Sequence, residues 1–511
     1  MIAVAAPSVA SLVQSVDWVA IAPPTIAAVV ALVVLVADLF VAERRKPLLG
    51  WISIAGLAAA ALALLPLIGD ERSTFCLKGA PYDACSYTAD RFTLVIQFLV
   101  LAGALLTALL SVSSLKDAKN ANRPLPEGEF WFLLLSSAAG AALLPASRDL
   151  ATLVVALEVA SLPAFALVGL KQGDRRSSDA ALKFFLSSVT ATAVTLLGVS
   201  FVYASTGSLH LTRVATELTH VDGQFHTLAQ TGVALTLVGF AFKTAAVPFH
   251  FWVPDTYVGA PLPIAAYLSV IGKAVGFSGL ILVTVVAFPS YADVWGPALA
   301  ALAALTMTVG NVAAIRQQAT RAYSAVRLLA WSSVGQAGYL LVPIAAAAYS
   351  DDPQKSIGST LAYALMYAAV NLGAFAVAAL VARTKPLNRI SDYRGLYASN
   401  PLAALVLGFF LLCLAGLPPG IIGLFAKVTV FSAAVDAGLG WLAVVMAVNV
   451  VIALFYYLQW TATLFRAPEG APAVHRATRP LTAAIAVTAV IGVALSGAPQ
   501  MVLRFASTGL F

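Results

Sequence analysis

Charge is scarce in this sequence. Asp, Glu, Lys and Arg together make up only 10% of the 511 residues, and 60% of the residues are hydrophobic, whereas a soluble domain carries about 25% charged residues. Apolar stretches of about 20 residues recur from end to end, and each is long enough to cross the roughly 30 Å hydrocarbon core of a bilayer. The composition therefore excludes a soluble globular protein and predicts an all-α polytopic membrane protein in a lipid bilayer.

Cysteine is also scarce, and the common cofactor-binding motifs are missing. The three cysteines, Cys76, Cys85 and Cys413, form no C-x-x-C pair and no cluster with histidine, which argues against iron–sulfur or zinc ligation. No G-x-G-x-x-G motif opens a helix after a strand, so no nicotinamide or flavin site is expected in this chain. Cys76 and Cys85 share one loop, but their spacing alone does not fix a disulfide.

The chain is basic, with a formal charge of +7, but it lacks the basic patches that bind nucleic acid. Its Lys and Arg residues are scattered through short loops without interleaved aromatic residues, so no nucleic-acid partner is expected. The first basic residue is Arg44, so the basic segment that begins a cleaved signal peptide is missing, and we expect the first apolar stretch to remain as a helix.

The apolar stretches predict about 14 transmembrane helices in a single membrane domain over residues 1–511. Their approximate ranges are 20–40, 49–68, 92–114, 129–146, 150–170, 178–203, 229–256, 262–287, 295–315, 324–348, 357–382, 401–435, 439–465 and 480–503. The longest connections, near 69–91 and 204–228, are too short to bury a separate hydrophobic core.

Basic residues are distributed unevenly between the two sets of loops. Loops that follow odd-numbered helices hold 19 Lys and Arg residues, and the opposite loops hold 7. Cytoplasmic loops of membrane proteins are enriched in Lys and Arg, so the first set is predicted to face the cytoplasm. Both termini and the loop with Cys76 and Cys85 would then lie on the outer side, where a disulfide can persist.

Five ionisable residues lie inside the predicted membrane helices. They are Glu158, Lys183, Lys243, Lys273 and Lys427. A charged group at membrane depth is costly and usually marks a path for ions or protons. The structural alternatives are a carboxylate that stays neutral and a lysine that extends toward the interface. One glutamate and four lysines on five helices fit a proton path better than a pocket for one ligand.

Glu158 and Lys183 lie in consecutive helices, which an antiparallel hairpin would bring together. We therefore expect these two side chains to form an ion pair whose state responds to a proton arriving nearby. Lys273 lies in the middle of the eighth helix, too deep to extend easily to the interface. His250 follows Lys243 by seven residues, and it is either a proton relay or a hydrogen-bonding group that compensates for a break in the helix.

Two of the predicted helices are interrupted close to a lysine. Pro248 and Pro254 follow Lys243 in the seventh helix, and the run Gly-Leu-Pro-Pro-Gly at 416–420 precedes Lys427 in the twelfth. Neither segment can continue as a regular α-helix. Irregular backbone at membrane depth is tolerated where it is buried in protein or lines a water-filled cavity, so both lysines are expected beside hydrated backbone.

The two interrupted helices also predict an internal repeat, because paired broken helices in the two halves of a chain are typical of transporters. The expected organisation is N-terminal helices 1–3 in residues 1–127, a first repeat of helices 4–8 in 128–290, a second repeat of helices 9–13 in 291–466, and a last helix in 467–511.

Residues 248–263 read PFHFWVPDTYVGAPLP and lie between Lys243 and Lys273. This segment resembles the signature of the antiporter-like membrane subunits of respiratory complex I, and most closely that of the subunit N branch. Segments 328–333, 393–396 and 416–427 support the resemblance, which covers roughly helices four to thirteen. The sequence departs from the common pattern at Leu262, Val326 and Gln336, which puts a histidine role in the tenth helix in doubt.

The resemblance implies two inverted five-helix repeats with broken helices 7 and 12, in a bacterial inner membrane. It implies that Glu158, Lys183, Lys243, Lys273 and Lys427 translocate protons from the cytoplasm to the outside, driven by quinone reduction elsewhere in the complex. The chain would be one subunit of the enzyme NADH:quinone oxidoreductase and would perform no redox catalysis itself. FMN, iron–sulfur clusters and quinone are expected in other subunits, and subunit M and K/J-type subunits are expected as neighbours.

The same charged residues would also serve a subunit of an Mrp-type cation/proton antiporter, which has no redox partners. The full form of the 248–263 segment favours the subunit N branch. A photosynthetic relative of complex I is a further alternative. A passive membrane scaffold is a poor fit, because charged groups at mid-membrane would only destabilise it.

Overall fold

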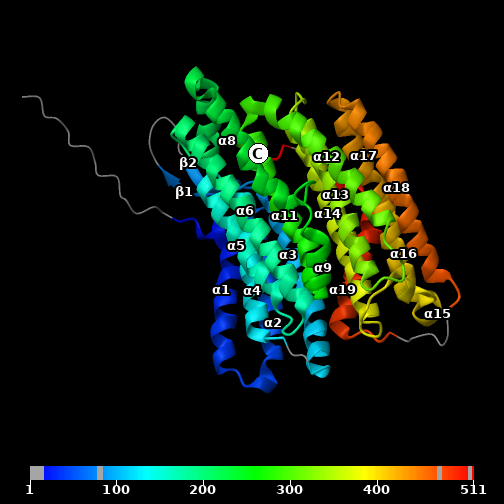
Figure 1. Cartoon of the computed structure of the whole chain (residues 1–511). Helices are drawn as coiled ribbons and strands as arrows, with labels where there is room; N and C mark the ends of the chain where they lie inside the picture. Colours follow the sequence, from blue (N-terminus) through cyan, green and yellow to red (C-terminus); the bar gives the residue numbers. More distant parts are fainter. Residues whose placement is uncertain (1–15, 78–83, 123–124, 469–474, 505–508) are drawn as a thin grey trace, which may run out of the picture.

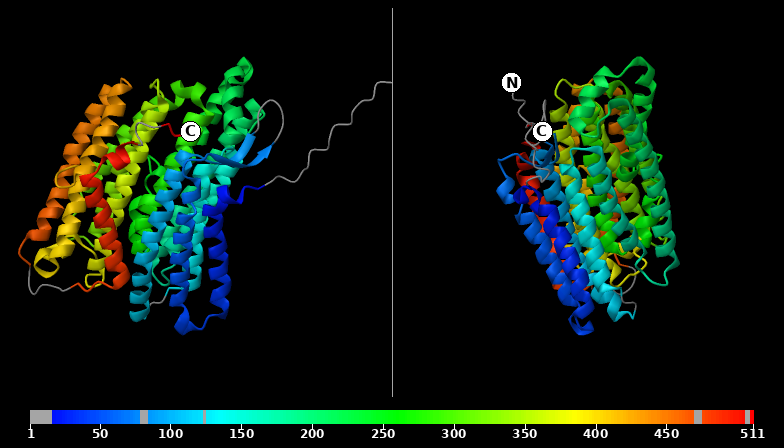
Figure 2. Two further views of the ribbon diagram at one scale, coloured as in Figure 1. Left: turned by 180° about the vertical axis from the view of Figure 1, so that it is seen from behind. Right: turned by 90° about the vertical axis from the view of Figure 1, so that its left-hand side faces the viewer.

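The protein is a bundle of long, roughly parallel helices with a small β-hairpin at one end (Figures 1 and 2). The structure is a computed structural model, and it describes residues 16–77, 84–122, 125–468, 475–504 and 509–511. The predicted outer position of the N-terminus, and Lys78 and Arg123 of the loop charges, lie outside the described residues.

The first half of the chain, through residue 287, holds eleven of the helices in the described part. They are α1 (Trp18–Phe40), α2 (Pro47–Leu62), α3 (Arg91–Asn120), α4 (Glu127–Leu143), α5 (Leu150–Gly169), α6 (Arg175–Thr206), α7 (Leu211–Glu217), α8 (His226–Thr244), α9 (Val253–Gly259), α10 (Leu262–Tyr267) and α11 (Lys273–Ile281). Two π-helical segments, Leu268–Gly272 and Leu282–Ala287, extend α10 and α11 into one long element.

The second half holds nine helices among its described residues. They are α12 (Ala292–Ile315), α13 (Ser324–Ala346), α14 (Pro353–Ala382), α15 (Leu396–Ser399), α16 (Pro401–Ala415), α17 (Ile421–Asp436), α18 (Gly440–Phe465), α19 (Arg479–Gly497) and α20 (Gln500–Leu503). Short 3₁₀ turns join several of these elements.

The predicted transmembrane helices are confirmed. By length and composition, 13 helical segments of the described chain could cross a membrane, and each matches one predicted span. The remaining predicted span, the twelfth, is the consecutive pair α16 and α17. The connection predicted at 204–228 also contains the short helix α7. The division into repeats at residues 128, 291 and 467, and their inverted relation, stay predictions.

Aspartate residues fix where several of the long helices begin. Asp90, Asp149 and Asp174 precede α3, α5 and α6, and each side chain accepts a hydrogen bond from a backbone N–H of the first turn. Such N-caps satisfy donors that have no partner within the helix. Because the aspartates lie in the loops, they also keep the polar ends of the helices at the two surfaces of the bundle.

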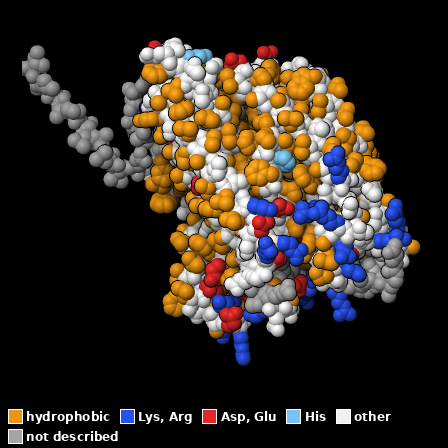
Figure 3. All heavy atoms as spheres, in the orientation of Figure 1, with side chains coloured by type: hydrophobic (Ala, Val, Ile, Leu, Met, Phe, Trp, Pro, Cys, Tyr) orange, Lys and Arg blue, Asp and Glu red, His pale blue; other side chains and the backbone are white. Residues whose placement is uncertain are grey.

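The most buried helices form the centre of the bundle. Nearly all residues of α13 and α14 are buried, as are those of the α10–α11 element. By contrast, α1, α6, α18 and α19 expose large apolar side chains. Hydrophobic side chains cover much of the face shown in Figure 3. A chain surrounded by lipid or by neighbouring subunits is expected to have such an apolar outer face.

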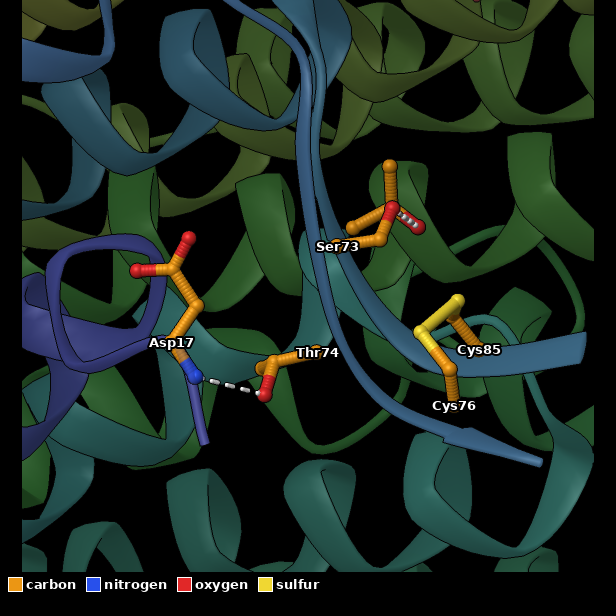
Figure 4. Close-up of a disulfide and its surroundings, with 6 residues drawn as sticks. Asp17, Ser73, Thr74, Cys76 and Cys85 are labelled. Atoms are coloured by element: carbon orange, nitrogen blue, oxygen red, sulfur yellow. Dashed lines mark hydrogen bonds between the residues drawn. A yellow bond between two sulfur atoms is a disulfide. The ribbon is translucent and has the colours of Figure 1, made fainter. Parts of the chain in front are cut away.

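Part of the connection at 69–91 forms a β-hairpin, which the sequence analysis did not predict. Strands β1 (Arg72–Leu77) and β2 (Ala84–Ala89) are antiparallel, and Cys76 lies opposite Cys85. These two cysteines form a disulfide (Figure 4), which settles the question that their spacing left open.

The hairpin is attached to the start of α1. The backbone N–H of Asp17 donates to Thr74 Oγ1 at 3.0 Å, and Arg72 contacts the Asp17 carboxylate at 3.2 Å. The backbone N–H of Ala20 and the Arg72 guanidinium lower the pKa of Asp17. These contacts hold the disulfide-linked hairpin against the end of the bundle.

The two ends of the bundle differ in charge. Lys and Arg side chains gather at the end that holds the α1–α2 connection and α15, whereas few appear at the opposite end, where α8 and α12 begin (Figures 1 and 3). The hairpin lies toward this second end (Figure 1). The loops that the sequence analysis grouped by charge therefore gather at a common end of the molecule.

Candidate functional site: a buried row of amines and hydroxyls

The seventh predicted helix consists of two helices separated by a non-helical segment. Helix α8 ends at Thr244, Ala245 adopts a left-handed conformation with φ of 64°, and α9 begins at Val253. The backbone N–H of Val247 donates to Thr306 Oγ1 at 2.9 Å, and Trp252 Nε1 donates to the Phe242 carbonyl at 3.3 Å. Side chains therefore supply hydrogen bonds that the interrupted helix cannot make internally.

Lys243 lies in the last turn of α8 and is buried. Its Nζ donates to Ser161 Oγ at 2.6 Å and lies 5.7 Å and 5.5 Å from the ring centroids of Phe165 and Phe184. A hydroxyl and two aromatic faces can stabilise an ammonium group inside the protein. The surroundings of Lys243 therefore suit a lysine that exists both with and without its proton.

Glu158 lies on α5 three residues before Ser161, and thus on the same face of the helix. The Glu158 carboxylate interacts electrostatically with Lys243, and its Oε1 accepts a hydrogen bond from Thr192 at 2.6 Å. Lys243, at the broken helix, is therefore a lysine that interacts electrostatically with Glu158.

The predicted ion pair between Glu158 and Lys183 is wrong. Lys183 Nζ lies 2.9 Å from Asp179 and 3.1 Å from Asp255. Thr192, which contacts Glu158, lies nine residues after Lys183 on α6, roughly 13 Å along the helix axis. The hairpin does bring α5 and α6 together, but the two side chains lie at different heights along it.

Asp255 is a junction between two basic side chains. Besides Lys183, its carboxylate contacts Arg327 at 3.5 Å. Asp255 lies on α9, directly after the break, whereas Lys183 and Arg327 lie on α6 and α13. All three side chains are partly exposed, so this cluster connects the broken helix to the surface of the bundle.

Lys273 lies at the centre of the bundle, directly after the π-helical segment Leu268–Gly272. Its Nζ donates to the backbone carbonyl of Ser333 on α13 at 2.5 Å. The π-helical geometry is frequent at functional sites because it redirects side chains within a helix. Gly276, one turn after Lys273, lies against Thr244, where a Cβ would come within 2.7 Å of the Thr244 nitrogen. This glycine lets the two lysine-bearing helices approach closely.

The twelfth predicted helix is also broken, and Lys427 closes the break. Helix α16 ends at Ala415, Gly416 has a φ of 83°, and α17 begins at Ile421. Lys427 Nζ, on α17, donates to the carbonyls of Leu414 and Ala415 at 3.0 Å and 2.6 Å. The last carbonyls of a helix carry partial negative charge and have no partner within it. The buried Lys427 amine is therefore a cap for α16.

A series of buried polar groups lies between Lys273 and Lys427. Ser333 Oγ accepts a hydrogen bond from Tyr367 at 2.9 Å. One turn further along α13, Gln336 Nε2 contacts the Leu414 carbonyl at 3.5 Å, and Lys427 donates to the same carbonyl. Gln336 and Lys427 therefore share the Leu414 carbonyl as an acceptor.

Tyrosine hydroxyls complete the surroundings of Gln336. Tyr363 donates to Gln336 Oε1, and Gln336 Nε2 donates to Tyr457 at 3.2 Å. A cavity of about 20 Å³ borders Gln336, Tyr363, Tyr367 and Lys427, which is room for one water molecule. The space between Gln336 and Lys427 can therefore hold a water molecule.

His250 lies in the segment between α8 and α9 and is half-buried. Its ring centroid lies 5.5 Å from that of Trp331, and no described residue provides a hydrogen-bond partner for its buried Nδ1. Neither of the two roles predicted for His250 is tested by these contacts.

The structure thus places Glu158 within electrostatic range of Lys243, and buried polar groups line the interval between Lys273 and Lys427. It places Lys183 in a separate, partly exposed cluster. The sequence analysis missed Ser161, Ser333 and Asp255, and it gave Gln336 no role. Asp255 is part of the 248–263 segment, which offered a signal for it, whereas an isolated serine in an apolar helix carries little signal in a single sequence.

Comparison with known proteins gives one consistent result. A family model described as "NADH:quinone oxidoreductase/Mrp antiporter, TM" matches residues 147–453. The chain is 74% identical to NADH-quinone oxidoreductase subunit N 2 of Streptomyces griseus, over all of this chain and 96% of that protein. It is 44% identical to NADH-quinone oxidoreductase subunit N of Salinispora tropica, over 89% of this chain and 86% of that protein.

A solved structure agrees with these relatives. A chain of respiratory complex I from Thermus thermophilus with bound aureothin matches with a TM-score of 0.75 and 30% identity, over 95% of this chain and 100% of that chain. The resemblance expected from residues 248–263 is therefore confirmed, and the chain belongs to the family of NADH-quinone oxidoreductase subunit N.

Proposed function

We propose that protons cross this chain, as a membrane subunit of NADH–quinone oxidoreductase, along the buried row from Glu158 and Lys243 through Lys273 to Lys427. One observation supports this route above all. Lys273 donates to the Ser333 carbonyl, and Gln336, one turn further along α13, shares the Leu414 carbonyl as an acceptor with Lys427, so buried polar groups line the interval between the two lysines. Buried polar groups at membrane depth are too costly to occur without a role.

Protons would enter from the end of the bundle rich in Lys and Arg, beside the break between α8 and α9. The Lys183–Asp255–Arg327 cluster lies at this entry and would replace the Glu158–Lys183 pair as the electrostatic link to a neighbouring subunit. When Asp255 holds Lys183, that positive charge stays away from Lys243. When the contact opens, the charge near Lys243 changes, and its proton affinity changes with it.

The exit would lie at the hairpin end, on the outer side of a bacterial inner membrane, where both termini are also expected. Two observations support this orientation. Lys and Arg gather at the opposite end, as expected for cytoplasmic loops, and the Cys76–Cys85 disulfide suits an oxidising compartment.

Electron transfer would take place in other subunits of the complex, which would hold FMN, iron–sulfur clusters and quinone. The chain would perform no redox step itself. We expect subunit M and K/J-type subunits as its direct neighbours, in contact with the apolar outer faces of the bundle.

Replacing Gln336 with leucine tests the route. The substitution keeps the size of the side chain similar but removes the link to the Leu414 carbonyl and to two tyrosines. In the complete complex reconstituted in liposomes, we expect fewer protons pumped per NADH oxidised. Gln317→Leu is the matched control, because Gln317 lies beyond the end of α12 and bonds only to its own helix. Unchanged pumping by Gln336→Leu would disprove the route through this side chain.

A further inference from the structure

A deep apolar crevice opens on one side of the bundle. Helices α2, α3, α14 and α19 border it, and its volume is about 1180 Å³, larger than most small-molecule sites. The view from behind in Figure 2 shows α19 in red and the blue helices of the N-terminal part near this face. Its lining is mainly Leu, Ala, Val and Ile, and Phe98 and Leu65 are 55% and 60% exposed, so the crevice opens to the surface.

The crevice has the length of a lipid acyl chain. Along α3 it extends from Arg91 to Leu106, which corresponds to roughly 22 Å of helix. It therefore begins at the hairpin end and reaches beyond the middle of a hydrocarbon core about 30 Å thick. A void of this size with apolar walls would lose its packing contacts if it stayed empty in the membrane.

The mouth of the crevice carries charges of both signs. Arg91, Asp70 and Glu71 line it; Asp70 and Glu71 precede β1, and Arg91 is the first residue of α3. Within the described part of the chain, no ion pair engages any of these three side chains. Asp90 also borders the crevice, but it already pairs with Arg148.

The last residues of the described chain close one edge of this mouth. The backbone N–H of Phe92 donates to the Leu510 carbonyl at 3.1 Å, and the Phe511 ring lies 4.9 Å from the Phe92 ring. Gln354 Oε1 accepts the backbone N–H of Leu510 at 2.9 Å. The mouth is thus built from residues 69–71, which precede the hairpin, from the start of α3 and from residues 509–511, and a ligand there would contact all three.

We propose that this crevice binds one aminophospholipid of the phosphatidylethanolamine class from the leaflet at the hairpin end. Its acyl chains fill the space between α3, α14 and α19, the Arg91 guanidinium binds its phosphate, and Asp70 and Glu71 accept hydrogen bonds from its ammonium group. The two carboxylates disfavour a lipid with only negative charge, and a quinone head group offers them no cation.

The test uses the complete complex, purified and reconstituted in liposomes with a phosphatidylethanolamine that carries a photoreactive diazirine in its acyl chain. After irradiation, we expect labelled peptides from α3 and α14, and excess phosphatidylethanolamine should suppress the labelling better than phosphatidylglycerol. Arg91→Gln should weaken the labelling about tenfold, as expected for the loss of a charge-assisted contact. Arg44→Gln, at the other end of the bundle, is the control and should change nothing.

Two further variants separate this site from general lipid contact. Ala369 lines the crevice and is partly exposed, so the indole of Ala369→Trp should obstruct part of it and weaken the labelling while the complex still assembles. Neutralising Asp70 and Glu71 together should shift the preference toward phosphatidylglycerol. The proposal is wrong if the crevice stays unlabelled, if both lipids compete equally in the unmodified chain, or if a long-chain quinone displaces the probe more effectively.

Discussion

Replacing Gly416 with alanine would show whether the position of Lys427 controls pumping. Gly416 ends α16 with a φ of 83°, and an added Cβ would lie 3.2 Å from Lys427 Cδ and 3.4 Å from its Nζ. Alanine in the left-handed conformation costs about 1–2 kcal/mol. The new methyl group would also push the amine away from the carbonyls of Leu414 and Ala415.

The size of this second effect follows from the hydrogen bonds that would be lost. A hydrogen bond from a charged donor is worth about 1.5–3 kcal/mol, so losing one of the two would change the balance between protonated and neutral Lys427 roughly ten- to hundredfold. Because each proton on the proposed route passes Lys427, such a change should slow pumping markedly. Electron transfer should slow with it, to the extent that the two are coupled.

Gly438→Ala is the matched control. Gly438 has a similar φ of 73°, but an added Cβ would meet no atom within 4 Å. Both variants therefore carry the same backbone strain, and only Gly416→Ala disturbs Lys427. The assay measures NADH oxidation and acidification together in liposomes that contain the complex, with thermal inactivation as a measure of stability.

The expected result is a loss of stability in both variants, larger for Gly416→Ala because it also loses a hydrogen bond of Lys427, and slower pumping only for Gly416→Ala. An equal loss of pumping in the two variants would mean that backbone strain alone causes the effect. Normal pumping by Gly416→Ala would show that the exact position of the Lys427 amine is unimportant, and the reasoning would fail.

Three further predictions concern other parts of the chain. Asp255→Asn should free Lys183 and Arg327 and slow pumping, whereas Asp174→Asn, a helix cap, should not; equal effects on pumping would contradict the role of the cluster. Burial lowers the pKa of Lys171 to about 8, so the unfolded chain binds more protons between pH 8 and 10.5, and resistance to thermal inactivation should rise with pH there. Lys171→Met should remove this rise, and an unchanged pH profile would contradict it. Replacing Cys76 and Cys85 with serine should destabilise the hairpin by about 2–3 kcal/mol, seen as faster proteolysis within 72–89, whereas Cys413→Ser should leave that rate unchanged.

The membrane helices and both breaks could be predicted because their causes are local. An apolar stretch long enough to span a bilayer, and a proline that removes a backbone donor, act within a few residues of their own position. The same holds for Lys243 and Lys427, which the sequence singles out as charged residues in apolar stretches and which the structure buries. The hairpin was missed because the helices were predicted from the length of apolar stretches, and this length gives no information about short strands.

Which side chains meet could not be predicted in the same way. The position of Glu158 relative to Lys183 depends on how far α5 and α6 are offset along their axes. Glu158 lies beside Thr192, which is nine residues after Lys183 on α6. The role of Gln336 depends on three other segments that supply Leu414, Tyr363 and Tyr457. Side-chain direction and helix height follow from packing across the whole bundle, which a single sequence does not display.

The contact of Lys427 with the end of α16 has a mechanical consequence. One amine both holds a proton on the proposed route and fastens two half-helices together, so these two properties cannot vary independently. Any force that draws α16 away from α17 must change the proton affinity of Lys427. Thermodynamic reciprocity requires that protonation of Lys427 change the free energy of the contact between α16 and α17 by the same amount. Protonation of Lys427 Nζ and the separation of α16 from α17 would thus be thermodynamically coupled.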